Sequence, residues 1–274
     1  MITYGKLIEN AKKKIDLNDL EYRAIYLFLS DILKVDKTRL LLMKDEMVNE
    51  DVLEKFSEML ADYIVDYRPI EYILGYTYFY GNKIKVNENV LIPRDETEEL
   101  VEKALLYIGK NSKVLDLCTG SGAIAISLKK ERSDIDVFAS DISKAALSVS
   151  EENARYNNVN IKFYEGDLLE PFIGKEKFDV IVSNPPYISK DYKLNEIVEH
   201  EPKIALFADD NGLSNYKKII QDLDKVLNKG GTILFEIGYD QAKDVKNLLF
   251  KEFTDIEIIQ DYNKLDRIVI AKKR

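Results

Sequence analysis

The sequence predicts an α/β fold in which a sheet of seven mainly parallel strands follows a small bundle of helices. Two patterns support this prediction. From Glu96 onwards, short apolar segments alternate with longer segments whose apolar residues recur at helical spacing. The short segments lack the polar alternation of half-exposed strands, which indicates strands buried on both faces. Upstream, residues 6–68 contain no glycine or proline, and their apolar residues also recur at helical spacing.

Changes in composition divide the chain into three parts. Residues 1–67 are expected to form a domain of about four helices. Residues 68–93 are rich in aromatic and β-branched side chains, and they predict a linker with a β-hairpin around Gly81-Asn82. Residues 94–274 are expected to form the domain that contains the sheet.

In this last domain the predicted elements alternate along the chain. Helices are expected over 97–107, 123–130, 144–156, 213–227 and 241–251. Strands are expected over 114–117, 137–140, 161–167, 178–183, 231–237, 253–261 and 266–273, with the last two paired antiparallel. Ligands of doubly wound sheets bind beyond the carboxyl ends of the strands, so we expect the functional residues in the loops that follow them.

Composition excludes several classes of function. The chain has 40 Lys and Arg against 49 Asp and Glu, a net charge of −9, so purely electrostatic binding to nucleic acid or a membrane surface is not expected. A single cysteine, Cys118, excludes an internal disulfide, and a single histidine, His200, leaves too few imidazoles for a His-rich metal site or a His-based triad. We therefore expect chemistry without a metal. The chain shows neither a signal peptide nor about 18 consecutive apolar residues, so we expect a cytoplasmic protein.

The loop after the first sheet strand reads DLCTGSGA. Asp116 lies near the end of the strand, and Gly120 and Gly122 form the turn into the next helix. Glycines in such a turn let the backbone approach a ligand, and the N–H groups at the helix start face it. Ala125 stands where the dinucleotide fingerprint G-x-G-x-x-G needs its third glycine. The turn therefore predicts a ligand site without the dinucleotide motif.

Acidic residues also follow the next two strands. Asp141 is placed to accept hydrogen bonds from both hydroxyls of a ribose, and Asp167 is expected beside the same crevice. No cluster of Arg and Lys accompanies them to hold phosphates, which favours a nucleoside without phosphates. S-adenosylmethionine fits this set, with its ribose on Asp141, its adenine near Asp167, and its amino group and sulfonium near Asp116.

The loop after the fourth strand contains the most informative motif, Asn184-Pro185-Pro186-Tyr187. The prolines fix φ and lack N–H donors, so the exposed carbonyls and the Asn184 side chain predict a rigid cluster of hydrogen-bond acceptors beside the flat face of Tyr187. Such a cluster suits a planar NH2 group on an sp² carbon. We expect methyl transfer to that nitrogen, promoted by positioning and by acceptors that stabilise its growing positive charge, with Asn184, Pro185 and Tyr187 as catalytic residues.

Together, LDLCTGSGAIAISL, SDIS, GDLL and NPPYI resemble a class I S-adenosylmethionine-dependent methyltransferase of the amino-methylating type. Residues 68–102 and 199–219 further resemble the HemK/PrmC family of protein N5-glutamine methyltransferases. This resemblance covers about residues 68–270. It implies a Rossmann-like methyltransferase domain at 94–274. It also implies class 1 peptide chain release factors as partners, with the target glutamine in their Gly-Gly-Gln tripeptide and the helical domain at 1–67 binding the rest of the factor.

The resemblance also implies roles for individual positions. Cofactor binding is assigned to Asp116, Thr119, Gly120, Ser121, Gly122, Ala123, Asp141, Asp167, Leu168 and Asn184. Substrate binding is assigned to Asn184, Pro185, Pro186 and Tyr187. The chain departs from the family pattern at Asp95, where a proline is usual, and at Cys118, where the first glycine of D-x-G-x-G-x-G is usual.

Two alternatives remain open at this point. The NPPY motif would also accept the exocyclic amino group of adenine N6 or guanine N2 in DNA or RNA. The net charge of −9 and the lack of a large base-reading insertion argue against this alternative. A cofactor-binding interaction protein without catalysis is the second alternative, and the intact NPPY motif and Asp141 argue against it.

Overall fold

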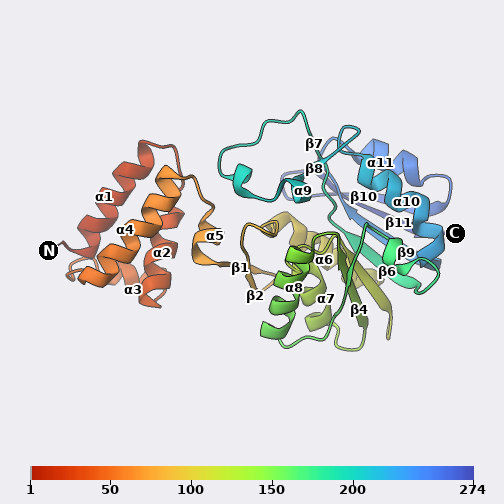
Figure 1. Ribbon diagram of the computed structural model, residues 1–274, viewed down its shortest axis with the longest axis horizontal. Coiled ribbons are helices and arrows are strands. Elements are labelled where there is room, and N and C mark those ends of the chain that lie inside the picture. Colours follow the sequence, from red (N-terminus) through yellow and green to blue (C-terminus); the bar gives the residue numbers. More distant parts are fainter. Residues whose placement is uncertain (1) are drawn as a thin grey trace. The chain divides into compact units, whose positions relative to one another are not determined.

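The computed structural model describes residues 2–274, which form two compact units. Figure 1 labels most of their helices and strands. The first unit contains the chain up to Gly75 and the segment Asn195–His200, and the second contains Tyr76–Leu194 and Glu201–Arg274. The sequence predicts a boundary after residue 67 instead. No helix among the described residues is long and apolar enough to cross a membrane.

The first unit is a bundle of helices. Its elements are α1 (Tyr4–Asp16), α2 (Arg23–Leu33), α3 (Lys37–Leu42), α4 (Glu50–Val65), α5 (Ile70–Leu74) and the 3₁₀ turn η2 (Val198–His200). The apolar faces of the helices meet in one core around Phe28, Phe56 and Tyr63. Ile70 of α5 and Ile197 pack against this core, which explains why the unit extends to Gly75 and includes a distant segment.

The second unit begins with a β-hairpin of β1 (Tyr76–Phe79) and β2 (Asn82–Lys85). Its turn is formed by Tyr80 and Gly81, which both have positive φ, as a two-residue turn of type I′ requires. The hairpin predicted around Gly81-Asn82 is therefore present. Asn153 of the following domain holds β2 through hydrogen bonds to the N–H and the carbonyl of Lys85.

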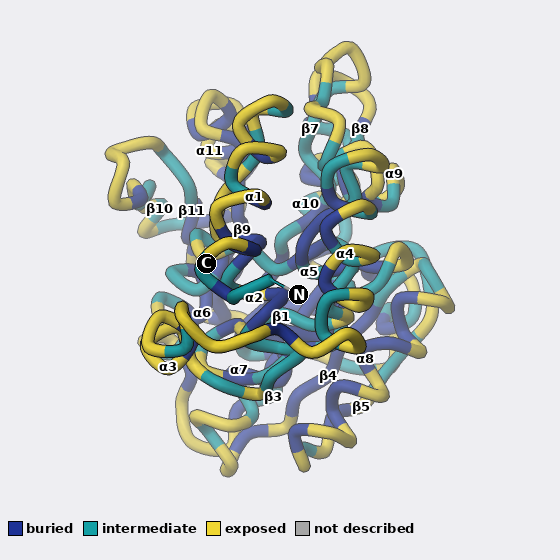
Figure 2. The backbone as a smooth tube through the Cα atoms, turned by 90° about the vertical axis from the view of Figure 1, so that its left-hand side faces the viewer, coloured by how far each residue is buried: buried dark blue, intermediate teal, exposed yellow. Residues whose placement is uncertain are grey.

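The main sheet has seven strands in the order β10-β11-β9-β6-β3-β4-β5, and all neighbours are parallel except those of β11. The strands are β3 (Lys113–Leu117), β4 (Asp136–Asp141), β5 (Lys162–Glu165), β6 (Phe178–Ser183), β9 (Leu227–Glu236), β10 (Phe253–Gln260) and β11 (Asp266–Lys273). The predicted fold class is thus confirmed. The central strands are buried along most of their length, as Figure 2 shows.

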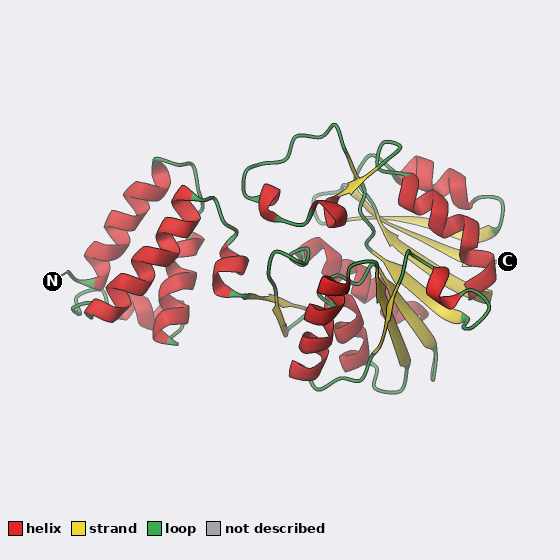
Figure 3. Cartoon of the chain, viewed as in Figure 1, coloured by secondary structure: helices red, strands yellow, loops and turns green. Residues whose placement is uncertain are grey.

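Helices pack on the sheet in two groups (Figure 3). The first group is α6 (Asp95–Tyr107), α7 (Ala123–Glu131) and α8 (Lys144–Tyr156), and the second is α10 (Ser214–Val226) and α11 (Ala242–Leu249). The remaining short elements are η1 (Glu170–Phe172), β7 (Ile188–Ser189), α9 (Lys203–Leu206) and β8 (Phe207–Ala208), with β7 and β8 paired in parallel.

The alternation of side chains along the strands decides which residues can reach the functional edge. Leu115 and Phe235 point to the face that α10 and α11 cover, where Phe235 packs edge-to-face on Tyr216. Their neighbours Asp116 and Glu236 therefore point to the opposite face. There Asp116 bonds to the backbone of α7 and Glu236 bonds to a side chain of α6.

Candidate active site

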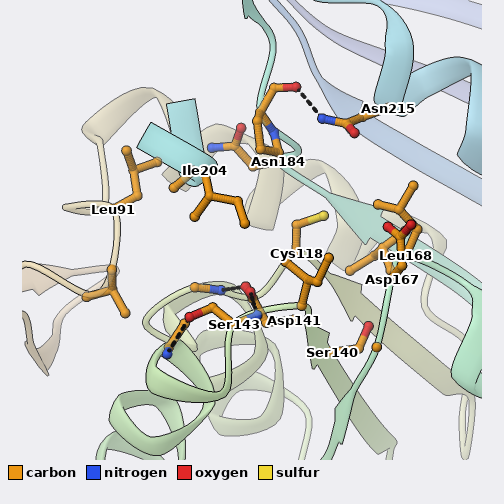
Figure 4. Close-up of a pocket in the computed structure, with 18 of the residues that line it drawn as sticks. Leu91, Cys118, Ser140, Asp141, Ser143, Asp167, Leu168, Asn184, Ile204 and Asn215 are labelled. Carbon is orange, nitrogen blue, oxygen red and sulfur yellow. Dashed lines mark hydrogen bonds between the residues drawn. The ribbon is translucent and has the colours of Figure 1, made fainter. Parts of the chain in front are cut away.

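A pocket of about 260 Å³ lies beyond the carboxyl ends of β3, β4, β5 and β6 (Figure 4). Register pairs Leu117 with Ser140 and with Ser183, so these strands end side by side. The loops that follow them therefore meet at one edge of the sheet, as predicted for a doubly wound fold. Among the predicted site residues, those that line the pocket are Gly120, Asp141, Asp167, Leu168, Asn184 and Pro186.

The loop between β3 and α7 is shaped by left-handed backbone. Cys118 has φ of +63° and Gly122 has φ of +82°. A Cβ atom on Gly122 would lie 3.0 Å from the Cβ of Ser150 in α8, so α8 would have to shift by a few tenths of an ångström, and the positive φ would add backbone strain. Cys118 adopts a backbone conformation that favours glycine, which explains why glycine is usual at this position in the family pattern. The Cys118 side chain lines the pocket (Figure 4).

Asp141 connects two loops at the pocket wall. Its Oδ2 accepts a hydrogen bond from the Gly120 N–H at 2.9 Å, and its Oδ1 accepts one from the Ser143 N–H at 2.9 Å. Burial raises the pKa of this carboxyl group, while the backbone donors counteract that rise. Each carboxylate oxygen retains a further lone pair, so the group can accept hydrogen bonds from a ligand as well.

Asp116 lies beneath the loop and does not line the pocket. Its Oδ2 accepts hydrogen bonds from Thr119 Oγ1 at 2.5 Å and from the Ala125 N–H at 3.1 Å. Its Oδ1 has no hydrogen-bond partner among residues 2–274, and burial raises its pKa to about 7. The observed bonds give Asp116 the role of fixing the start of α7. Its contact with a ligand stays a prediction.

The other predicted residues of this turn, Thr119, Ser121, Gly122 and Ala123, also lie outside the pocket lining. In the loop after β5, Asp167 and Leu168 do line it. The Nζ of Lys218 lies 3.8 Å from Oδ2 of Asp167. No sequence pattern singles out Lys218, which reaches the pocket from α10. The ammonium group of Lys218 faces the Asp167 carboxylate, so it is not a free cation that could bind a phosphate group.

Two further segments line the pocket, Asn89–Leu91 and the stretch from Ile204 to Phe207. Glu201 joins them, because its buried carboxylate accepts a hydrogen bond from the Ile92 N–H at 2.9 Å and pairs with Arg94. Neither segment is predicted from the sequence. The EHEP stretch contributes only to the family resemblance, because nothing local in it indicates a partner more than a hundred residues upstream.

The NPPY loop is held from several sides. Asn184 Nδ2 donates to Thr97 Oγ1 at 3.4 Å, and Asn215 Nδ2 donates to the Pro186 carbonyl at 2.8 Å (Figure 4 shows the latter). Gln241 Nε2 donates to the Tyr187 carbonyl at 3.0 Å. The Pro186 and Tyr187 carbonyls thus each already accept one hydrogen bond. Within residues 2–274, neither Asn184 Oδ1 nor the Pro185 carbonyl accepts a hydrogen bond. Asn184 lines the pocket, whereas Pro185 is buried and lies outside the lining.

Tyr187 is not among the residues that line the pocket. Its hydroxyl donates to Glu236 Oε1 at 3.3 Å, and burial raises the pKa of the phenol. Neither Glu236 nor Thr97 is predicted from the sequence. No group of three or more His, Cys, Asp or Glu side chains in the described part of the chain is arranged to hold a metal ion. That the chemistry proceeds without a metal stays a prediction.

Comparisons with known proteins agree with this geometry. A family model described as the PrmC N-terminal domain matches residues 6–75, and one described as the Methyltransferase small domain matches residues 95–204. The chain is 41% identical to the release factor glutamine methyltransferase of Bacillus cereus, over 93% of this chain and 94% of that protein. It is 35% identical to the protein of the same name from Staphylococcus aureus, over 99% and 100% of the two chains.

The chain belongs to the family of release factor glutamine methyltransferases. It is therefore a methyltransferase, and the predicted family is confirmed.

Solved structures support the same fold. The ribosomal protein L11 methylase from Lactobacillus delbrueckii subsp. bulgaricus aligns with a TM-score of 0.51 and 25% identity, over 66% of this chain and 81% of that one. A methyltransferase from Pyrococcus furiosus aligns with a TM-score of 0.55 and 18% identity, over 70% and 89% of the two chains. The second likeness concerns the fold alone.

Proposed function

We propose that this methyltransferase transfers a methyl group from S-adenosylmethionine to the side-chain amide nitrogen of the glutamine in the Gly-Gly-Gln tripeptide of class 1 release factors, in the cytoplasm. The observation that supports the proposal most directly is that the NPPY loop has hydrogen-bond acceptors without partners. Asn184 Oδ1 and the Pro185 carbonyl are two acceptors without partners in residues 2–274, and Asn184 lines the pocket. A primary amide has two N–H donors to offer them. The names of the relatives add support.

The pocket residues fit the cofactor. The Asp141 carboxylate suits the two hydroxyls of a ribose, and Asp167 and Leu168 would lie against the adenine, while the Gly120 backbone would approach the amino-acid part. Lys218 is paired with Asp167, which agrees with a ligand that has no phosphate groups. When bound, the cofactor supplies an electrophilic methyl group on a sulfonium.

The residues of the chain would act on the target amide. Asn184 Oδ1 and the Pro185 carbonyl accept its two N–H bonds, which holds the nitrogen in a fixed orientation for in-line attack. An amide nitrogen is a poor nucleophile because its lone pair is delocalised. As the N–CH3 bond forms and the S–CH3 bond breaks, the nitrogen would gain positive charge and both acceptors would bind its hydrogens more strongly, which stabilises the transition state more than the bound substrate. S-adenosyl-L-homocysteine would leave as the product, and the nitrogen would lose one of its two protons to solvent.

Transfer of labelled methyl to purified release factor tests the proposal. The assay also contains, in separate reactions, a factor whose tripeptide glutamine is replaced by alanine, total DNA and total RNA. We expect label only on the wild-type factor. Label on the alanine variant would place the target elsewhere in the factor, and label on nucleic acid would favour the exocyclic-amino alternative.

A further inference from the structure

We infer that Thr97 and Glu236 form a polar chain that orients the amide of Asn184, so that its oxygen and not its nitrogen faces the target. The two residues are positioning residues, because they act through Asn184. The inference rests on the proposed function for the identity of the target. The hydrogen bonds from which it is argued do not depend on that function.

Glu236 lies at the end of β9 with 2% of its surface exposed, and Thr97 lies in α6 with 4% exposed. The Glu236 carboxylate receives two hydroxyls: Oε2 accepts from Thr97 Oγ1 at 2.7 Å, and Oε1 accepts from the Tyr187 hydroxyl at 3.3 Å. In the structure both hydroxyls donate to the carboxylate, which is the arrangement that an ionised carboxylate requires because it has no hydrogen of its own to donate. Burial raises the pKa of Glu236, while the Arg267 guanidinium and the two hydroxyls favour its charged form.

This arrangement determines which group donates in the hydrogen bond between Thr97 and Asn184. The only hydroxyl hydrogen of Thr97 is donated to Glu236, so toward Asn184 its Oγ1 can only accept. Asn184 must therefore present its NH2 group to Thr97, at 3.4 Å, and its Oδ1 is left for the pocket side. A flipped amide would set two oxygens against each other at Thr97 and would offer the target NH2 a donor instead of an acceptor.

The same carboxylate also holds the other end of the motif. Glu236 bonds to the hydroxyl of Tyr187 and, through Thr97, to the side chain of Asn184. One buried group thus determines the position of both polar side chains of the NPPY loop. Thr97 lies 139 residues from Glu236 in the sequence, so only the fold reveals the connection.

Kinetics of Thr97→Val and Thr97→Ser at saturating cofactor test the inference. Valine keeps the shape of threonine and removes the hydroxyl, so we expect kcat/KM for the release factor to fall at least about tenfold, mainly through kcat. Serine restores the hydroxyl and should recover most of the loss. Thr232→Val removes another buried threonine hydroxyl, from the middle of β9, and serves as the control that leaves the rate unchanged.

Two results would overturn the inference. One is a Thr97→Val enzyme within about twofold of the wild type, and the other is a Thr97→Ser enzyme as slow as Thr97→Val, which would indicate a packing role. If the wild type does not methylate the factor, the proposed function fails instead.

A second test, NMR of the side-chain amide of Asn184, uses the wild-type protein alone and so requires neither a substrate nor a variant that folds. We expect its NH2 hydrogens to exchange with solvent more slowly than those of exposed Asn263. Equal exchange in the wild type would contradict the bond to Thr97.

Discussion

Asp141 combines two tasks at the pocket wall, because its carboxylate anchors the loops after β3 and β4 and faces the ligand space. Asp141→Ala removes the acceptors proposed for the ribose hydroxyls. Hydrogen bonds to a charged group contribute about 1.5–3 kcal/mol each, so we expect the affinity for S-adenosylmethionine to fall at least about tenfold by calorimetry. Asp136→Ala, at the exposed opposite end of β4, is the control. An unchanged affinity of the Asp141 variant would remove Asp141 from the cofactor site.

The site residues that can be predicted from the sequence are those that follow strands. Asp141, Asp167 and Asn184 are predicted from their place after apolar runs, and Leu168 from the family resemblance, and all four line the pocket. Residues such as Asn215, Lys218, Thr97 and Glu236 cannot be predicted in this way. Each lies within a regular helix or strand and acts on a loop that is distant in the sequence, and no local pattern encodes that contact.

Among the elements, the turn before α10 is packed against the NPPY loop. Gly212 has φ of +84°, and a Cβ atom there would collide with the Tyr187 carbonyl oxygen and lie 2.5 Å from Gln241 Nε2. Gly212→Ala must therefore displace the loop. We expect kcat/KM to fall at least about tenfold and the free energy of unfolding to fall by about 1–3 kcal/mol.

The matched control for this prediction is Gly174→Ala. Gly174 has φ of +74°, but a Cβ atom at this position would have no neighbour within 4 Å, so alanine has only the backbone cost of about 1 kcal/mol. Its methyl transfer should equal that of the wild type. Similar losses of activity in the two variants would show that backbone strain, and not contact with Tyr187, limits the reaction.

The turn from β3 into α7 makes stability depend on pH through Asp116. Burial raises the pKa of this carboxyl to about 7 from 3.8, so between these pH values the folded protein binds the proton more tightly than the unfolded chain. The free energy of unfolding must then decrease as pH rises from about 4 to 7, by on the order of 4 kcal/mol from this group. Asp116→Asn lacks this titration, so urea unfolding should show the stability of the wild type falling relative to the variant across this range. Parallel curves would contradict the prediction.

Element boundaries show where sequence patterns are informative. Helix α8 and strands β6 and β11 have their predicted bounds. Polar residues flank the first two of these elements on both sides. Strand β9 begins at Leu227, although the sequence predicts helix up to that residue, because Leu227 pairs with Phe178 of β6. Helix α5 and the segment 195–200 are not predicted as parts of the first unit, because only packing against its core assigns them.

At the scale of the whole molecule, we propose that the helical unit binds parts of the release factor other than the tripeptide. A short peptide that contains Gly-Gly-Gln would then lack those contacts. We expect kcat/KM for the intact factor to exceed that for the peptide at least about tenfold, mainly through KM, because remote contacts contribute binding energy. Steady-state kinetics with both substrates measure the difference. Equal values would mean that the helical unit contributes nothing to recognition.

The proposed reaction depends most directly on the acceptor oxygen of Asn184. The measurement that tests it is kcat/KM of Asn184→Ala for the release factor at saturating cofactor, beside Asn263→Ala as a control at an exposed position. Loss of one preorganised hydrogen bond costs about 2–4 kcal/mol, so we predict a fall of about 30- to 1,000-fold for Asn184→Ala and none for the control. Turnover of Asn184→Ala near the wild-type rate would show that the amide nitrogen is activated by other groups.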